Sequence, residues 1–211
     1  ISETDRFAAE FGKSAMVVAN SSAWLIPMLD TVLDSLHLHG VKLAGDRVGR
    51  GAAPNAPRED VYRITSSILH AKPDCVVAVG GGSTIDAVKA ANVLASLGKW
   101  EPEIDSYFGT GLVTETLAKY GASLLPMIAV ETAAGSGAHL TKYSNITDPV
   151  AGQKKLIVDD AIVPDRAVFG YLITKSMPLS TTLDGAFDGL GHCLEVFYGI
   201  SEAKYDLASE I

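Results

Sequence analysis

Cysteine is scarce in this chain, and it has neither a long hydrophobic run nor an excess of basic residues. Its two cysteines, Cys75 and Cys193, form neither a CxxC pair nor a disulfide framework. No window approaches the roughly 18 to 20 unbroken apolar residues of a membrane span. The first residues also lack the basic-then-apolar order of a signal peptide. These absences predict a cytoplasmic protein that has no membrane partner.

Basic residues are outnumbered, with 17 lysines and arginines against 25 aspartates and glutamates and a net charge of −8. They are scattered rather than striped, which argues against a nucleic-acid partner. A hydrophobic content of 47% allows a substantial core, so we expect one large domain or one domain plus part of another. The chain starts without methionine and stops inside a helical pattern, so we expect further residues beyond Ile211.

Short runs rich in β-branched residues alternate with longer amphipathic stretches. Strands are expected at 15–19, 41–43, 75–79 and 126–130, and helices at about 23–36 and 59–71. The runs at 75–79 and 126–130 are apolar on both faces, as a central parallel strand requires. This alternation predicts an α/β fold built on a doubly wound, Rossmann-like parallel sheet.

Strand signals stop near Pro178. Beyond it, a helical face is formed by Leu183, Phe187, Leu190, Leu194 and Phe197. We therefore expect one α/β domain over residues 1–177. Residues 178–211 would begin an all-helical domain that continues past the end of this chain.

A glycine-rich turn, 80–82, joins the strand at 75–79 directly to a helix. Glycines allow backbone N–H groups to approach an anion at a helix N-terminus, and a pyrophosphate is the natural ligand. Ser83 and Asp86 have the spacing of a capping arrangement. The alternative is a tight turn that binds nothing, because the segment lacks the GxGxxG spacing.

A second loop of small residues, Thr132 to Gly137, follows the strand at 126–130 and carries two hydroxyls and two glycines. It could supply donors to phosphate, ribose or nicotinamide, although the pattern alone is weak. Two such loops at the carboxyl ends of parallel strands mark the crevice in which doubly wound proteins hold nucleotides.

Four polar residues lie on adjoining turns of the helix after Pro178, namely Asp184, Asp188, His192 and Glu195. Asp188 and His192, at i and i+4, could chelate one divalent ion with further ligands from elsewhere. The alternative is a solvated acidic face that includes a histidine by chance.

The glycine-rich turn, the second loop and the polar helix after Pro178, in this order, resemble the iron-containing (group III) alcohol dehydrogenase family. Relatives of that family include maleylacetate reductases, glycerol dehydrogenases and dehydroquinate synthases. Segment 80–89 is similar to the family's glycine motif and segment 131–141 to its Pro-Thr-Thr-x-Gly-Thr-Gly-Ser-Glu-x-Thr motif. Segment 188–195 is similar to its Asp-Ala-x-x-His-x-x-Glu helix. The resemblance spans nearly the whole chain. It implies that residues 1–177 form a dinucleotide-binding α/β domain and that residues 178–211 begin an all-helical metal-binding domain.

The resemblance implies a set of site residues. Asp188 and His192 would be metal ligands at the catalytic centre, with two further histidines beyond Ile211. The cofactor-binding residues would be Asn20, Gly81, Gly82, Ser83, Asp86, Thr132, Ala133, Gly135, Ser136, Thr141 and Lys155. Among these, Lys155 would approach the ribose or nicotinamide side.

Several residues depart from the family pattern. Glu131 replaces a proline and His139 replaces a glutamate in the second loop. Asn20 stands where many members have an aspartate that binds the adenosine ribose and repels a 2′-phosphate, so NADP remains possible beside NAD. Asn55 falls near the family's adenine-pocket Asn-Pro, but an inserted alanine loosens that match.

The resemblance implies a metal-dependent, NAD(P)-linked oxidoreductase that interconverts a small-molecule alcohol and an aldehyde or ketone. Fe(II) is the expected metal and Zn(II) is possible; a homodimer is also implied. Maleylacetate reductases typically carry asparagine at the Asp188 position and need no metal, so the carboxylate favours metal dependence. A metal-independent reductase and a non-catalytic nucleotide-binding fragment stay as alternatives.

Overall fold

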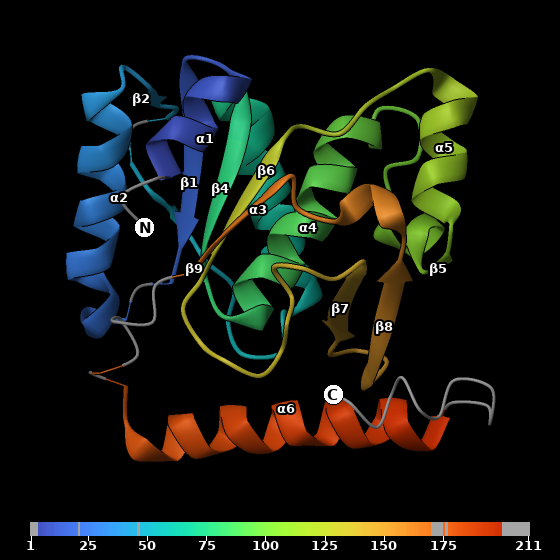
Figure 1. Ribbon diagram of the computed structural model, residues 1–211. Coiled ribbons are helices and arrows are strands. Elements are labelled where there is room, and N and C mark those ends of the chain that lie inside the picture. Colours follow the sequence, from blue (N-terminus) through green and yellow to red (C-terminus); the bar gives the residue numbers. More distant parts are fainter. Residues whose placement is uncertain (1–3, 21, 46, 170–174, 176, 200–211) are drawn as a thin grey trace.

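A parallel β-sheet forms the centre of the computed structural model, which describes residues 4–20, 22–45, 47–169, 175 and 177–199 (Figure 1). Its strand order is β2-β1-β4-β6-β9, with β3 also paired with β1, and every pairing is parallel. The strands are β1 (Ser14–Ala19), β2 (Lys42–Leu43), β3 (Gly49–Arg50), β4 (Cys75–Gly80), β6 (Met127–Glu131) and β9 (Arg166–Phe169). The predicted α/β, Rossmann-like sheet is confirmed.

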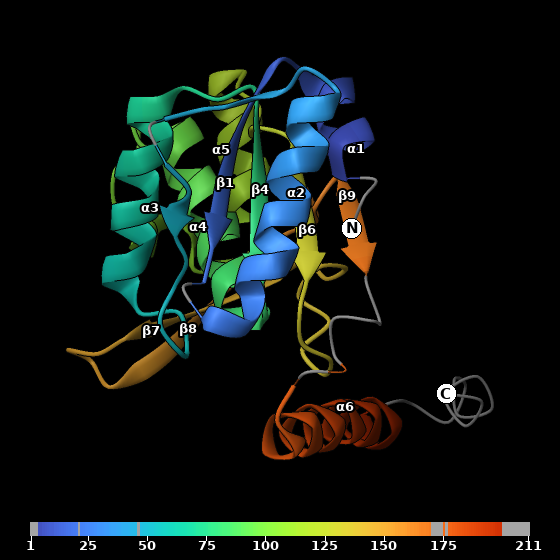
Figure 2. The ribbon, with the colours of Figure 1, turned by 90° about the vertical axis from the view of Figure 1, so that its left-hand side faces the viewer.

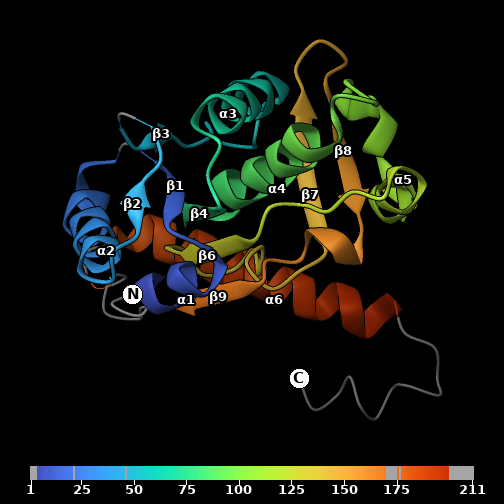
Figure 3. The same cartoon turned by 90° about the horizontal axis from the view of Figure 1, so that it is seen from above.

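Helices cover both faces of this sheet, as Figure 3 shows for α1 on one side and α3 with α4 on the other. The helices are α1 (Thr4–Phe11), the 3-10 turn η1 (Ala23–Leu25), α2 (Ile26–Leu38), α3 (Arg58–Ala71) and α4 (Gly82–Leu97). A hydrophobic core lies on each face of the sheet, and successive strand residues point alternately into the two cores. Val17 belongs to the core that contains Val32 of α2, whereas Val18 belongs to the core that contains Ile85 of α4. The period-2 alternation of strand side chains explains this division.

A second, three-stranded sheet stands beside the first, in the order β5-β8-β7. Its strands are β5 (Gly109–Thr110), β7 (Tyr143–Asp148) and β8 (Gln153–Val158), and β7 and β8 form an antiparallel hairpin. Three short elements flank it, η2 (Ile104–Tyr107), α5 (Leu112–Tyr120) and η3 (Asp160–Ile162). This hairpin was not predicted from the sequence.

The last described helix, α6 (Leu179–Gly199), lies beyond the carboxyl ends of the sheet strands (Figures 1 and 2). The predicted helix is confirmed over these residues, and residues 200–211 fall outside the described part. Its apolar side chains are exposed, Phe187 by 68% and Leu190 by 55%. Cys193 on α6 is exposed as well, whereas Cys75 is buried in β4. None of the described helices is long and apolar enough to cross a membrane.

Candidate active site

The first glycine loop ends where α4 begins, at Gly82, with Gly81 as the N-cap residue. The predicted Ser83–Asp86 capping arrangement is wrong, because no side chain caps this helix. Ser83 Oγ instead accepts the backbone N–H of Asn55 at 3.0 Å. Thr84 and Ile85 donate their N–H groups to the Gly81 carbonyl, and no described side chain caps the helix at Gly82 and Ser83. The N–H groups of these two residues are therefore the donors that could meet an anionic group such as a pyrophosphate.

The second loop packs directly against the first. A Cβ on Gly82 would lie 2.9 Å from both Cβ and Oγ of Ser136, and a Cβ on Gly81 would lie 3.4 Å from Cβ of Ala133. Thr132 donates its backbone N–H to the Gly80 carbonyl at 3.1 Å. The structure thus brings both loops together at the carboxyl edge of β4 and β6. The glycines permit this close approach.

Asp86 and Lys89 of α4 hold the chain that follows the second loop. Asp86 Oδ2 accepts the backbone N–H of Asn145 at 3.0 Å, and Lys89 Nζ donates to the carbonyls of Thr141 at 2.6 Å and Tyr143 at 2.9 Å. Burial raises the pKa of Asp86 to about 6 and lowers the pKa of Lys89 to about 8. The carboxylate of Asp86, which the resemblance predicted to contact the cofactor, is hydrogen-bonded to the protein backbone and so positions β7.

Two asparagines lie near the first loop. Asn20 is exposed just after β1, and its Oδ1 accepts the Ser22 hydroxyl at 3.3 Å. Asn55 has a positive φ of 66°, which asparagine tolerates better than most residues. Its carbonyl accepts the Thr147 hydroxyl at 2.7 Å, while its N–H donates to Ser83. Asn55 therefore links the start of α4 to the β7–β8 hairpin.

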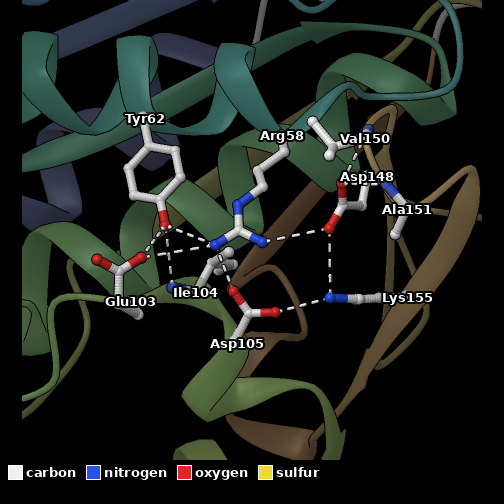
Figure 4. Close-up of polar contacts among 9 residues, drawn as sticks. All are labelled: Arg58, Tyr62, Glu103, Ile104, Asp105, Asp148, Val150, Ala151 and Lys155. Atoms are coloured by element: carbon white, nitrogen blue, oxygen red, sulfur yellow. Dashed lines mark hydrogen bonds and ion pairs between the residues drawn. The ribbon is translucent and has the colours of Figure 1, made fainter.

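Lys155 belongs to an ion-pair network that joins α3, η2 and the hairpin (Figure 4). Its Nζ lies 2.7 Å from Asp105 Oδ1 and 3.3 Å from Asp148 Oδ2, and Arg58 pairs with both carboxylates. The hydrogen bond between Lys155 and Asp105 lowers the pKa of Asp105 and raises that of Lys155. Lys155, which the resemblance predicted to approach the ribose or nicotinamide side, thus pairs with Asp105 and Asp148 in this structure.

The neighbouring Lys154 lies on the other face of β8 and was missed. It pairs across the hairpin with Thr147, and directly opposed residues of an antiparallel pair share a face. Thr147 binds Asn55, and Lys154 interacts electrostatically with Asp86 of α4. Lys154 is therefore the hairpin lysine on the side of the first loop. Strand alternation could have shown that the two lysines face opposite ways.

Asp188 and His192 lie together on α6, with Asp188 Oδ1 and His192 Nε2 3.6 Å apart. Both side chains are about half exposed, and His192 Nδ1 is 3.6 Å from Glu195 Oε2. Neither here nor elsewhere in the described ranges are three or more His, Cys, Asp or Glu side chains arranged to hold a metal ion. Carboxylate and imidazole suit Fe(II) or Zn(II), so the pair fits two positions of such an ion.

Two glycine contacts join α6 to the second loop. A Cβ on Gly185 would lie 2.5 Å from the Ala134 carbonyl oxygen, and a Cβ on Gly135 would lie 3.0 Å from Asp188 Oδ2. Gly135 also has a φ of +113°, which side-chain-bearing residues rarely adopt. The candidate metal ligands thus lie against the loop that is in contact with Gly81 and Gly82.

Comparison with known proteins points to one family. Residues 1–170 match the family model described as iron-containing alcohol dehydrogenase. The probable alcohol dehydrogenase EutG of Salmonella typhimurium is 30% identical over 146 residues, which are 69% of this chain and 34% of that protein. The NADPH-dependent butanol dehydrogenase of Clostridium saccharobutylicum is 28% identical over 88% of this chain and 46% of that protein.

A solved structure agrees with these matches. The NADH-dependent butanol dehydrogenase A of Thermotoga maritima superposes with a TM-score of 0.78 at 25% identity, covering 99% of this chain and 49% of that one. The chain spans about a third to a half of the length of these relatives. Because the family model covers most of the chain, the chain belongs to the iron-containing alcohol dehydrogenase family.

Proposed function

We propose that this chain supplies the nucleotide-binding part and two metal ligands of an NAD(P)-dependent alcohol dehydrogenase. The reaction would interconvert a small-molecule alcohol and an aldehyde or ketone. One observation carries the proposal: the second loop contacts the uncapped start of α4 on one side and Asp188 of α6 on the other. A nucleotide and a metal ion held by these groups would therefore be neighbours.

The two loops would bind different parts of the dinucleotide. The start of α4, with Gly81, Gly82 and Ser83, would bind the pyrophosphate through backbone N–H groups. The second loop, from Thr132 through Ala133 and Gly135 to Ser136, would line the cofactor. Thr141 would contribute to the cofactor site through its backbone, which Lys89 holds in place by a hydrogen bond to the Thr141 carbonyl. On the hairpin, Lys154 rather than Lys155 would face the nucleotide.

Asp188 and His192 would hold the metal ion, with Fe(II) the first expectation and Zn(II) the second. When bound, the ion would act as a Lewis acid on the substrate oxygen, and the nucleotide would exchange the hydride at its nicotinamide ring. The protein's own part is to hold the carboxylate and imidazole against the second loop and to orient the nucleotide. The remaining donors would come from outside the described residues.

The larger organisation is also part of the proposal. Residues 1–177 would form the dinucleotide-binding domain, and 178–211 would begin a helical domain. The exposed apolar side chains of α6 support this assignment, because such a face ordinarily packs against other helices. A cytoplasmic homodimer without nucleic-acid or membrane partners completes the proposal, and light scattering would test its mass.

The decisive experiment combines metal analysis, nucleotide titration and turnover on the purified full-length protein. Asp188→Ala and His192→Ala should remove bound metal and turnover but leave NADH or NADPH binding intact. Asp184→Ala is the matched control, because Asp184 lies one turn earlier on the same helix. If Asp188→Ala retained both metal and turnover, the metal assignment would be wrong.

Two other outcomes identify the alternatives. Activity that survives a strong chelator would support a metal-independent reductase of the maleylacetate type. Nucleotide binding without turnover of any alcohol or carbonyl substrate would support a non-catalytic nucleotide-binding protein. Since Asn20 is not a carboxylate, both NADH and NADPH should be titrated in each case.

A further inference from the structure

A buried acid–imidazole pair lies behind the second loop, at two positions where the sequence departs from the family pattern. Glu131 ends β6, opposite Gly80 of β4 and Phe169 of β9. Its Oε2 lies 2.8 Å from Nδ1 of His139, and both side chains are more than nine-tenths buried. The function proposed above gives neither residue a role.

The Glu131 carboxylate borders both segments that would hold the nucleotide. Its Oε1 accepts the backbone N–H of Ala133 at 3.3 Å and lies 4.0 Å from the place that a Cβ on Gly81 would take. A pyrophosphate at the start of α4 would thus bring negative charge next to a buried carboxylate. Like charges repel strongly in such a partly desolvated setting.

Other charged groups face the same carboxylate. Asp86 and Lys89 of α4 both interact electrostatically with Glu131. From α6, Asp188 adds a negative charge beside Gly135. When Asp86, Lys89 and Glu131 are all ionised, their net charge is −1. A proton on His139 would bring this cluster to zero.

The second ring nitrogen of His139, Nε2, is the atom that could accept that proton. This nitrogen is buried and has no hydrogen-bond partner within the part of the chain that the structure describes. The Phe169 ring meets the imidazole at right angles, with centroids 4.5 Å apart. Imidazole is also the side chain whose charge changes near neutral pH. Protonation at Nε2 would break no existing hydrogen bond.

We propose that Glu131 and His139 determine the affinity of the cleft for its dinucleotide, because the pair takes up one proton from solvent when the pyrophosphate binds. The proton goes to His139 Nε2, and the resulting imidazolium neutralises Glu131. This inference rests on the proposed function, since it requires a pyrophosphate at the two loops. Nucleotide affinity then falls as pH rises.

Isothermal titration of the full chain with NADH and with NADPH tests this proposal. Repeating each titration in buffers of different ionisation enthalpy, between pH 6.5 and 8.5, counts the protons taken up. We expect an uptake of close to one proton per nucleotide bound and, as a consequence of that uptake, up to about tenfold weaker binding per pH unit. His139→Gln retains a hydrogen-bond donor to Glu131 but cannot be protonated, so proton uptake and pH dependence should both disappear.

The matched control is His70→Gln, because His70 is exposed on the last turn of α3, and this variant should behave like the wild type. Glu131→Gln provides a second test if His139→Gln does not fold: it should bind more tightly above neutral pH and take up no proton. Proton uptake that persists in both variants would assign the effect to Asp86 and Lys89 and overturn the proposal. So would wild-type binding without proton uptake. If the wild type and every variant bind neither nucleotide, the proposed function itself fails, which is a distinct result.

Discussion

Gly82 has no room for a side chain, whereas its neighbour Gly81 has a little. A Cβ on Gly82 would be forced into Ser136 at 2.9 Å, but a Cβ on Gly81 would meet Ala133 at 3.4 Å, close to ordinary contact. We expect Gly82→Ala to lower the free energy of unfolding by about 1–3 kcal/mol. Gly81→Ala should cost clearly less. Urea unfolding measures both, and equal losses would contradict the packing of the two loops.

Asn20 is the residue at which nucleotide choice can be tested. The neutral side chain is exposed and accepts the Ser22 hydroxyl, which an aspartate could also do without moving. Asn20→Asp should therefore weaken NADPH binding at least about tenfold relative to NADH, because a carboxylate repels the 2′-phosphate. Fluorescence titration with both nucleotides gives the ratio. An unchanged ratio would place the ribose elsewhere.

Local sequence patterns predicted some contacts between residues and not others. The order of the motifs correctly placed Gly81, Gly82 and Ser136 together, because the carboxyl ends of adjacent parallel strands share one edge of a sheet. The spacing of Ser83 and Asp86 suggested a cap, but Asp86 binds Asn145, which is 59 positions further along the chain. A contact of that kind depends on tertiary packing and leaves no local signature.

At the scale of elements, strand β8 separates two adjacent lysines. Lys155 is held by Asp105 and Asp148, while Lys154 lies on the face of Thr147 and Asn55. Lys154→Met should weaken nucleotide binding by about threefold to tenfold, because one charge near the phosphates is lost. Lys155→Met should leave nucleotide binding nearly unchanged. Titration with NADH and NADPH measures both variants.

We expect Lys155→Met to affect the stability of the fold rather than nucleotide binding. Asp105 is well exposed and solvent screens its ion pairs, so we expect only a small loss in the free energy of unfolding, measured by urea unfolding. If Lys155→Met weakened nucleotide binding more than Lys154→Met, the assignment of the two faces would be reversed.

The two sheets differ in how well the sequence predicts them. Strands β4 and β6 carry continuous apolar runs, because helices cover both of their faces. Strand β7 reads Tyr-Ser-Asn-Ile-Thr-Asp, and β8 begins Gln-Lys-Lys. Polar residues dominate β7 and the first half of β8, whereas β8 ends in the apolar run Leu-Ile-Val, which was not predicted as a strand from the sequence. Contacts from α4, through Asp86 and Lys89, hold the β7 end of this hairpin in place.

At the scale of the whole molecule, the site depends on how α6 lies against the second loop. A Cβ on Gly185 would lie 2.5 Å from the Ala134 carbonyl, whereas a Cβ on Gly189, one turn later, would come no closer than 3.8 Å to Gly135. Gly185→Ala should therefore displace α6 and reduce kcat/KM at least about tenfold, because small misplacements of catalytic groups are costly. Gly189→Ala is the matched control.

Nucleotide titration separates this effect from general damage. Gly185→Ala should change the dissociation constant for NADH or NADPH much less than it changes kcat/KM, because Gly81 and Gly82 are untouched. Equal losses of turnover in the Gly185 and Gly189 variants would contradict a specific contact between α6 and the loop.

The sequence predicted the helices and strands of the molecule better than the contacts between segments that are distant in the chain. The spacing of apolar residues correctly predicted a helix after Pro178, since helical periodicity is local. It could not show that Gly185 meets Ala134 or that Glu131 meets His139, because those contacts arise only when the sheet places the second loop. The pairing of Glu131 with His139 is a consequence of the chain's own departures from its family.

The contrast between the two thiols has a practical consequence. Burial raises the pKa of Cys75 to about 12, so this thiol stays protonated and shielded inside the sheet. Cys193 is exposed on α6, directly after His192. A maleimide fluorophore should therefore label Cys193 and leave Cys75 unmodified, as mass spectrometry of peptides from the labelled protein would show. Its emission would then report the arrival of a metal ion at Asp188 and His192 in real time.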